Sequence, residues 1–114
     1  MSRLETADRS RIEAHQLARL QEGLGRILPH NRFYRQKLLQ DGEAIFIERL
    51  ADLARLPFTS KRELVNDQEE HPLFGTNLTY PASEYVRFHQ TSGTSGRPLK
   101  ILDTQESWDW WAEC

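Results

Sequence analysis

The residues best suited to binding or chemistry lie in one stretch of the chain, from His89 to Lys100. This stretch reads HQTSGTSGRPLK and contains four hydroxyl side chains, two glycines, one proline and two cations. Gly93 and Gly96 accept positive φ at little cost and let other atoms approach the backbone closely. A turn of this kind points consecutive N–H groups into one concavity, called a nest, which suits an anion. The stretch therefore has the chemistry of a phosphate-binding loop.

The side chains of this loop would add to such a nest. A hydrogen bond from a hydroxyl to a charged acceptor contributes about 1.5–3 kcal/mol, so three or four would hold a triphosphate. Composition alone nevertheless favours an ordinary hairpin connection, because Gly, Ser and Thr are common in turns. The candidate phosphate-binding residues are Thr91, Ser92, Gly93, Thr94, Ser95 and Gly96, with Arg97, Lys100 and His89 as auxiliary candidates.

Two better-known phosphate motifs do not fit this loop. A Walker loop needs Gly-x-x-x-x-Gly-Lys-Ser/Thr leading into a helix. Here the glycines are three apart, and Arg97 and Pro98 follow them. The dinucleotide fingerprint needs three glycines between a strand and a helix, whereas this loop is expected between two strands.

Strand character on both sides places the loop in a hairpin. The segment 85–90 is rich in aromatic and β-branched residues, which favours a strand with Val86 and Phe88 on one face. LKIL at 99–102 predicts a second short strand.

A last helix is expected after the hairpin, with Thr104 as its cap. It carries three tryptophans, which have large apolar surfaces that need packing partners. Their place near the end of this sequence suggests a neighbouring segment that covers them, and packing onto the chain's own helices is the alternative. The tryptophans are Trp108, Trp110 and Trp111.

The first half of the chain has helical periodicity. Apolar residues recur three and four apart over 17–28, and Pro29 ends this pattern. Asn31 is a good N-cap for a second helix, and Gly42 lies where a left-handed C-terminal cap is expected.

A third helix and a long loop complete the expected elements. The apolar series over 45–56 predicts one short helix, which Pro57 stops. Ser60 and Glu63 match the Ser-x-x-Glu capping box that begins a further helix, and Thr59 is the alternative cap. The segment 68–84 is polar and broken by prolines and a glycine, and so is expected to be loop.

Together these elements predict an α+β fold. A mostly helical half is followed by a β-hairpin around a Gly/Ser/Thr-rich loop and then by the start of a helix. The expected parts are a helical region (1–67), a loop (68–84), a strand–phosphate loop–strand unit (85–103) and a final helix (104–114).

Composition excludes several classes of function. Fifteen basic and seventeen acidic residues give a net charge of −2, which predicts no nucleic-acid partner. Cys114 is the single cysteine, so an internal disulfide is impossible and a reducing compartment is expected. No apolar run approaches the roughly 20 residues of a membrane span, so a cytoplasmic protein without membrane contact is predicted. The four histidines are scattered, which predicts no metal site, and no residue is assigned as catalytic.

The order of residues in the loop says more than its composition. TSGTSGRP at 91–98 closely resembles the phosphate-binding signature of the adenylate-forming enzymes, whose usual form is Thr-Ser-Gly-Thr-Thr-Gly-x-Pro-Lys. Leu99 stands where many members have lysine, and Lys100 comes one residue later. In a strand that shift turns the side chain to the opposite face, which weakens Lys100 as a phosphate ligand.

The resemblance extends upstream of the loop. Within the superfamily these segments resemble the N-terminal part of the phenylacetate–CoA ligase branch, and they cover roughly residues 31–111. They are FYRQKL (33–38), LADLARLPFTSKREL (50–64), PLFG (72–75) and VRFHQTSGTSGRP (86–98).

The resemblance implies a function for a larger protein. Residues 91–96 would wrap the β- and γ-phosphates of ATP while a carboxylate attacks the α-phosphorus, and CoA would then displace AMP. ATP, Mg²⁺ and CoA are thus implied, with the Mg²⁺ ligands outside this chain. The chain would be the N-terminal part of a larger α/β adenylate-forming domain and inactive by itself. The alternative is a small, non-catalytic helical module for interaction or nucleotide sensing that retains the loop.

Overall fold

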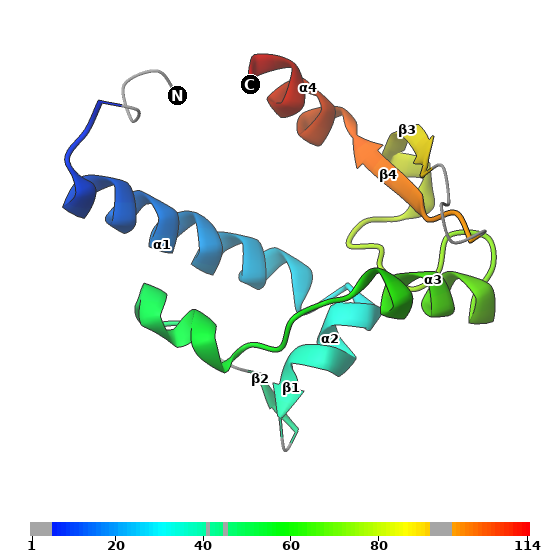
Figure 1. Ribbon diagram of the computed structural model, residues 1–114, viewed down its shortest axis with the longest axis horizontal. Helices are drawn as coiled ribbons and strands as arrows, with labels where there is room; N and C mark the ends of the chain where they lie inside the picture. The colour runs from blue at the N-terminus through cyan, green and yellow to red at the C-terminus, as the bar shows by residue number, and fades with distance from the viewer. Residues whose placement is uncertain (1–5, 41, 45, 92–96) are drawn as a thin grey trace.

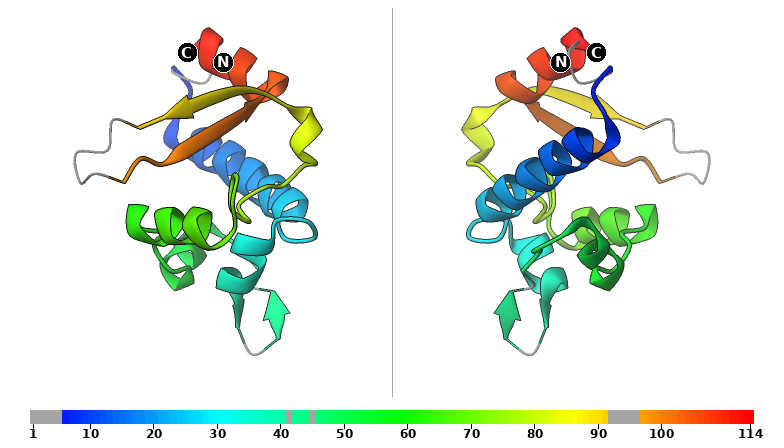
Figure 2. Two further views of the ribbon diagram at one scale, coloured as in Figure 1. Left: turned by 90° about the vertical axis from the view of Figure 1, so that its right-hand side faces the viewer. Right: turned by 90° about the vertical axis from the view of Figure 1, so that its left-hand side faces the viewer.

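A computed structural model describes residues 6–40, 42–44, 46–91 and 97–114 (Figure 1). Figure 2 shows α4 on one side of the β3–β4 hairpin and α3 on the other. The described elements are, in order, α1 (Arg9–Ile27), α2 (Arg32–Leu38), β1 (Leu39–Gln40), β2 (Glu43–Ala44), the 3₁₀ helix η1 (Leu50–Arg55), α3 (Lys61–Glu70), the 3₁₀ turn η2 (Ala82–Glu84), β3 (Tyr85–Gln90), β4 (Lys100–Thr104) and α4 (Gln105–Glu113).

Helix α1 begins at an aspartate cap and ends just before a proline. The Asp8 carboxylate accepts the Arg11 N–H at 2.9 Å, and this hydrogen bond lowers the pKa of Asp8. The helix continues through Gly23 and Gly25 without a break, because nineteen residues of backbone hydrogen bonding tolerate two weak helix formers. The predicted helix is confirmed, and it starts well before the periodic segment.

Asn31 caps α2, as predicted, and its side chain also bonds a distant segment of the chain. Its side-chain oxygen accepts the Tyr34 N–H at 3.0 Å, and its amide donates to Asn77 Oδ1 at 2.9 Å and Thr79 Oγ1 at 3.1 Å. Only 2% of Asn31 is exposed. A buried amide with all these partners satisfied fastens the 77–79 segment to the start of α2.

The prediction that Gly42 forms the C-terminal cap of a helix is wrong. Helix α2 ends at Leu38, and the chain then pairs β1 with β2 in a short antiparallel hairpin, Leu39 opposite Ala44. Gly42 has φ +81° as expected of a left-handed position, but it lies in the hairpin turn and not at a helix end.

Within the apolar series over 45–56, only Leu50–Arg55 is helical among the described residues, and it forms a 3₁₀ helix, η1, rather than an α-helix. Asp52 fixes its start, because its carboxylate accepts the N–H groups of Glu48 and Arg49 at 2.9 and 3.1 Å. These two bonds lower the pKa of Asp52. Ile47, just upstream, is 1% exposed, and its carbonyl accepts Gln21 Nε2 from α1 at 2.8 Å. This bond joins the two segments.

Helix α3 starts at the predicted capping box. The Ser60 N–H donates to Glu63 Oε2 at 2.7 Å, and the Glu63 N–H donates to Ser60 Oγ at 3.3 Å. The helix runs to Glu70, so residues 68–70 are helical and not loop as predicted. Pro72, two residues further on, marks its true end.

The 71–76 segment folds back onto α3. Asp67 accepts both the N–H and the hydroxyl of Thr76, at 2.7 and 2.5 Å. Gly75 has φ +74°, and a Cβ there would lie 2.3 Å from Asp67 Oδ2. Only glycine therefore fits this close approach.

The strands β3 and β4 pair in an antiparallel hairpin, which confirms the predicted strand–loop–strand unit. Phe88 lies opposite Leu102 and His89 opposite Ile101. The register shifts between Tyr85 and Arg87. This irregularity interrupts the alternation from which Val86 and Phe88 were expected to share a face.

Thr104 caps α4 as predicted, accepting the Ser107 N–H at 3.2 Å. The three tryptophans of α4 differ in their surroundings. Trp108 packs on this chain's own hairpin, whereas Trp110 and Trp111 are 47% and 63% exposed. Trp108 therefore packs on strand β3 rather than on a helix of this chain, and a neighbouring segment that covers the tryptophans stays a prediction.

Few apolar side chains are buried in the part of the chain that the structure describes. They are Leu38, Ile47 and Val65. Among the described helices, none combines the length and the apolar character that crossing a bilayer demands.

The ion pair between Lys37 of α2 and Glu63 of α3 generates a prediction about acid stability. A hydrogen bond from Lys37, and then the Ser60 backbone bond, lower the pKa of Glu63 from 4.5 to about 2. A depressed carboxyl pKa stabilises the fold above pH 4.5, and this contribution is lost as the pH falls towards 2. We expect Glu63→Gln, which can retain the capping box, to show a shallower loss of melting temperature between pH 4.5 and 2.

Thermal unfolding followed by circular dichroism across this pH range measures the effect. Glu70→Gln on the same helix is the matched control. Equal acid sensitivity in wild type and Glu63→Gln would contradict the role given to the Lys37 pair.

Candidate functional site

The glycine-rich loop is framed by residues that the structure describes, although Ser92 to Gly96 themselves lie outside the described residues. Its base is closed by two hydrogen bonds between its ends. The Thr91 N–H donates to the Leu99 carbonyl at 2.9 Å, and the Leu99 N–H donates to the Thr91 hydroxyl oxygen at 2.9 Å. Thr91 thus uses both its N–H and its hydroxyl oxygen at the base of the loop.

Helix α3 holds the outgoing arm of the loop through Gln68. The Gln68 amide donates to the Lys100 carbonyl at 2.8 Å, and its oxygen accepts the Lys100 N–H at 2.9 Å. One side-chain amide thereby satisfies both backbone groups of Lys100, as a neighbouring strand would. This pair fixes β4 on α3 at the point where the strand begins.

Arg97 reinforces the same attachment. Its guanidinium donates to both carboxylate oxygens of Glu69, at 2.9 and 2.6 Å, and to Asn66 Oδ1 at 2.7 Å. This fork geometry is the strong form of an arginine–carboxylate pair. The structure therefore places Arg97 on α3, and its auxiliary role towards phosphate stays a prediction.

Lys100 also uses its charged group within the fold. Its ammonium donates to the Leu73 carbonyl at 2.9 Å and lies 5.8 Å from the centre of the Phe74 ring. The side chain thus contacts the segment that follows α3. This placement agrees with the argument from strand register that Lys100 is a weak candidate for a phosphate ligand.

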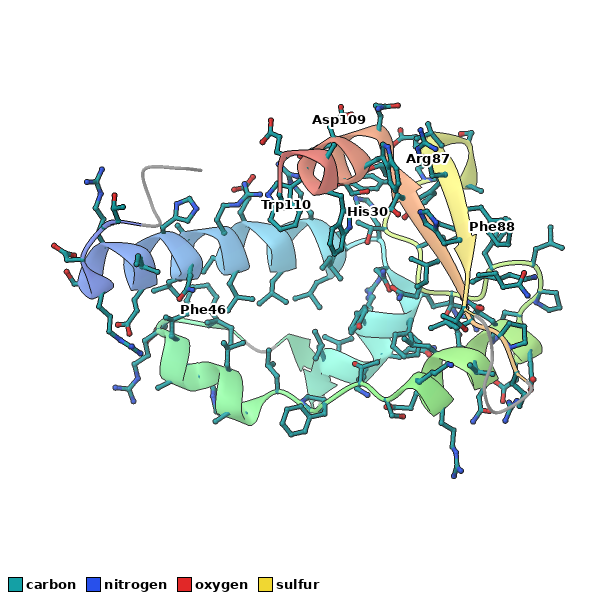
Figure 3. All side chains as sticks on the ribbon, turned by 45° about the horizontal axis from the view of Figure 1, so that its top comes forward. His30, Phe46, Arg87, Phe88, Asp109 and Trp110 are labelled. Carbon is teal, nitrogen blue, oxygen red and sulfur yellow. The ribbon has the colours of Figure 1, made fainter. Side chains whose placement is uncertain are left out.

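His89 belongs to the opposite face of the hairpin. Its ring stacks on Trp108 of α4, with centroids 5.4 Å apart and planes at 27°, and its Nε2 lies 3.5 Å from Asp103 Oδ2. Arg87 covers the same indole, with its Cζ 4.2 Å from the ring centre. These contacts tie the incoming strand to α4. Figure 3 shows Arg87 on the side of β3 next to α4 and Phe88 on the side away from it.

Asp103 links this cluster to the start of α4. Its Oδ1 accepts the Ser107 hydroxyl at 3.0 Å while Oδ2 faces His89. The serine hydroxyl bonds the carboxylate and not the imidazole. The three residues therefore do not form the relay of a nucleophilic triad.

A hollow of about 360 Å³ lies beside the attachment of β4 to α3. Its walls come from α3, the 74–79 segment and β4, and they include the apolar side chains of Leu64, Phe74 and Leu102. Gln68 and Lys100 supply polar groups at its side, and both use these groups in hydrogen bonds within the fold. The hollow thus offers mainly apolar contact.

The described residues include no cluster of three or more His, Cys, Asp or Glu side chains that could hold a metal ion. No set of Mg²⁺ ligands can therefore be assigned to this part of the chain.

The residues that position the loop were mostly missed by the sequence reasoning. Asn66 was not singled out, and Gln68 and Glu69 both fell in the segment 68–84 that was expected to be loop. The available signal was Pro72, because a helix continues most often to the residues just before a proline. With α3 extended that far, all three would have been placed on a helix.

Comparison with known proteins connects this geometry to a group of ligases. Phenylacetate-coenzyme A ligase of Pseudomonas putida is 34% identical over 110 residues, 96% of this chain and 24% of that protein. The enzymes of the same name from Thermus thermophilus and Escherichia coli K12 are 33% and 32% identical over 111 and 112 residues. No family model matches the sequence.

Solved structures give the same result. Crystal structures of 2-hydroxyisobutyryl-CoA ligase match with a TM-score of 0.83 for the postadenylation state with R3-HIB-AMP and 0.81 for the thioesterification state with 2-HIB-AMP and CoA. The identities are 29% and 32%, and each match covers 98% of this chain but only 23% and 24% of the ligase.

Over 98% of its length the chain has the fold of the matching part of these adenylate-forming ligases. Within the superfamily the chain is phenylacetate–CoA ligase-like over 96% of its length. It spans about a quarter of the length of the curated relatives that it matches.

The double hydrogen bond of Gln68 generates a prediction about the hairpin. Gln68→Glu keeps an acceptor for the Lys100 N–H but sets a carboxylate against the Lys100 carbonyl. We expect this change to lower the free energy of unfolding by about 1–3 kcal/mol, because a part-buried carbonyl loses its donor. Chemical denaturation followed by tryptophan fluorescence measures it.

Gln105→Glu is the matched control, since Gln105 bonds only the exposed Asp109 side chain on its own helix. A change at Gln68 that costs no more than this control would show that the amide does not hold β4.

Proposed function

We propose that this chain is the N-terminal, ATP-phosphate-binding part of an acid–thiol ligase. Such an enzyme activates an aryl or acyl carboxylate as an acyl-adenylate and transfers it to CoA. The single observation that carries the proposal is the eight-residue match at 91–98, seated between two paired strands. The names of the relatives and the ligands of the solved neighbours support it.

The framework around the loop supports a cradle for phosphate. The two bonds between Thr91 and Leu99 hold the ends of the loop together. A turn of this length with two glycines can converge its N–H groups on one anion. Because both strands that flank the loop are attached to helices, less conformational entropy is lost when the anion binds.

The chemistry follows from where charge develops. The carboxylate oxygen forms a bond to the α-phosphorus, the bond to the β-phosphate breaks, and pyrophosphate leaves. The thiol of CoA then forms the thioester, and AMP leaves with the bonding electron pair. In this scheme residues 91–96 bind the departing phosphates and accommodate their charge, which is electrostatic stabilisation by preorganised donors. The described residues supply no Mg²⁺ ligand set, so no step is assigned to the metal here.

Substitution of the loop glycines tests the cradle. A chimera is suitable: the P. putida ligase in which the matched 110-residue segment is replaced by the corresponding residues of this chain. We expect Gly93→Val with Gly96→Val to lower phenylacetate-dependent ATP–pyrophosphate exchange by about 10²–10³-fold, because the side chains displace the N–H groups from the phosphates. The melting temperature should change little.

Gly25→Ala is the control for this experiment, since a Cβ at Gly25 meets no atom within 4 Å. Unchanged exchange and unchanged ATP affinity in the double valine variant would refute the cradle.

The isolated chain provides a second prediction. We expect no acid-dependent ATP–pyrophosphate exchange above background from the purified 114-residue protein, because adenylation needs positioning and charge stabilisation from several parts at once. A radiolabelled pyrophosphate assay measures it, with the chimera as positive control. Exchange by the isolated chain would show that these residues suffice for catalysis.

A further inference from the structure

The chain exposes far more surface than its mass requires. Its accessible surface is 8698 Å², whereas a folded monomer of 13.4 kDa is expected to expose about 6,500 Å². The radius of gyration is 16.0 Å, against about 13 Å for a compact domain of this length. The difference of roughly 2,200 Å² exceeds the 800 Å² or so that each partner buries in a standard stable interface.

Part of this surface is a groove of about 320 Å³ between α1 and α4. Figure 3 shows Trp110 on the side of α4 that is turned towards α1. Trp110 and Trp111 meet edge to face with centroids 6.0 Å apart, and both stay largely open to solvent. We name this surface the tryptophan groove. It is lined by Arg19, Arg26, Tyr80, Thr104, Glu106, Ser107, Trp110 and Trp111.

The charges in the tryptophan groove have partners within the chain. Arg26 lies 2.7 Å from Glu22 and 3.7 Å from Glu106, and Arg19 lies 3.4 Å from Glu22. The two arginines are thus balanced by two glutamates, which disfavours an anionic ligand as the occupant. The exposed indoles instead favour an apolar polypeptide segment.

The β3–β4 hairpin next to the groove also exposes apolar side chains. Among the described residues, β3 and β4 pair only with each other. Val86, Phe88 and Ile101 are 54%, 52% and 44% exposed. A two-stranded sheet is marginal by itself in water and gains stability from further strands or a packed face. The exposed apolar surface of the hairpin next to α4 therefore resembles a hydrophobic core that lacks the segment packed against it.

We propose that the tryptophan groove is the surface on which the remaining three quarters of an adenylate-forming ligase pack against this segment. The occupant is a mainly apolar segment of that polypeptide, rather than a second copy of this chain. The surface excess supports this placement, and so do the solved ligases, where the same fold accounts for only 23–24% of one chain. Packing needs neither ATP nor catalysis, so this inference can stand or fall independently of the phosphate loop.

Hydroxyl-radical footprinting of the isolated chain and of the chimera tests the proposal. We expect labelling of Trp110 and Trp111 to fall several-fold in the chimera, whereas Phe58, which is 98% exposed before α3, stays labelled. In the chimera, Trp110→Ala with Trp111→Ala should lower the melting temperature by about 5 °C or more, and Phe58→Ala should not.

Several outcomes would overturn the proposal. Equal labelling of the tryptophans in the two proteins would show that the groove stays open. Equal protection of Phe58, or an equal loss on Phe58→Ala, would place the packing surface elsewhere. Light scattering should show the isolated chain as a monomer of 13.4 kDa. A stable dimer that protects the same tryptophans would assign the groove to a second copy, and a chimera without cooperative unfolding would show that the surfaces do not fit.

Discussion

The position of the glycine-rich loop depends on one side chain, the amide of Gln68. Strand β4 has β3 on one side, and at Lys100 the Gln68 amide takes the place of a strand on the other, with bonds of 2.8 and 2.9 Å. Two neutral hydrogen bonds in a part-buried setting contribute about 1–3 kcal/mol together. The exposed Arg97–Glu69 pair contributes about 1 kcal/mol or less. The Gln68 amide therefore contributes more to the attachment of β4 to α3 than Arg97 does. Arg97 orients the chain as it leaves the loop.

The two arms of the loop are held by different helices on opposite faces of the hairpin. Helix α3 holds the outgoing arm, and Trp108 of α4 holds the incoming arm through His89 and Arg87. The Thr91–Leu99 bonds join the arms between these supports. Such a frame holds the two ends of the loop together, which is the property that the proposed function needs.

The exposed surface and the proposed function have one physical origin. A segment with three buried apolar side chains among its described residues and about 2,200 Å² of excess surface is built to be covered. Adenylation likewise requires groups that converge from several parts of a protein. The same missing neighbours would thus complete both the core and the active site. The chain spans a quarter of its ligase relatives, which agrees with this view.

The sequence by itself determined the features that depend on near neighbours along the chain. The caps at Asn31, Ser60 and Thr104 were predictable because each acts within four residues. The β3–β4 hairpin and the residue order of its loop could likewise be predicted from residues adjacent in the sequence. The tertiary structure alone decided that Gly42 turns a hairpin, that Gln68 serves β4 and that Lys100 bonds Leu73. These roles join residues far apart in sequence or depend on where a helix stops, and packing, not local preference, selects among the partners.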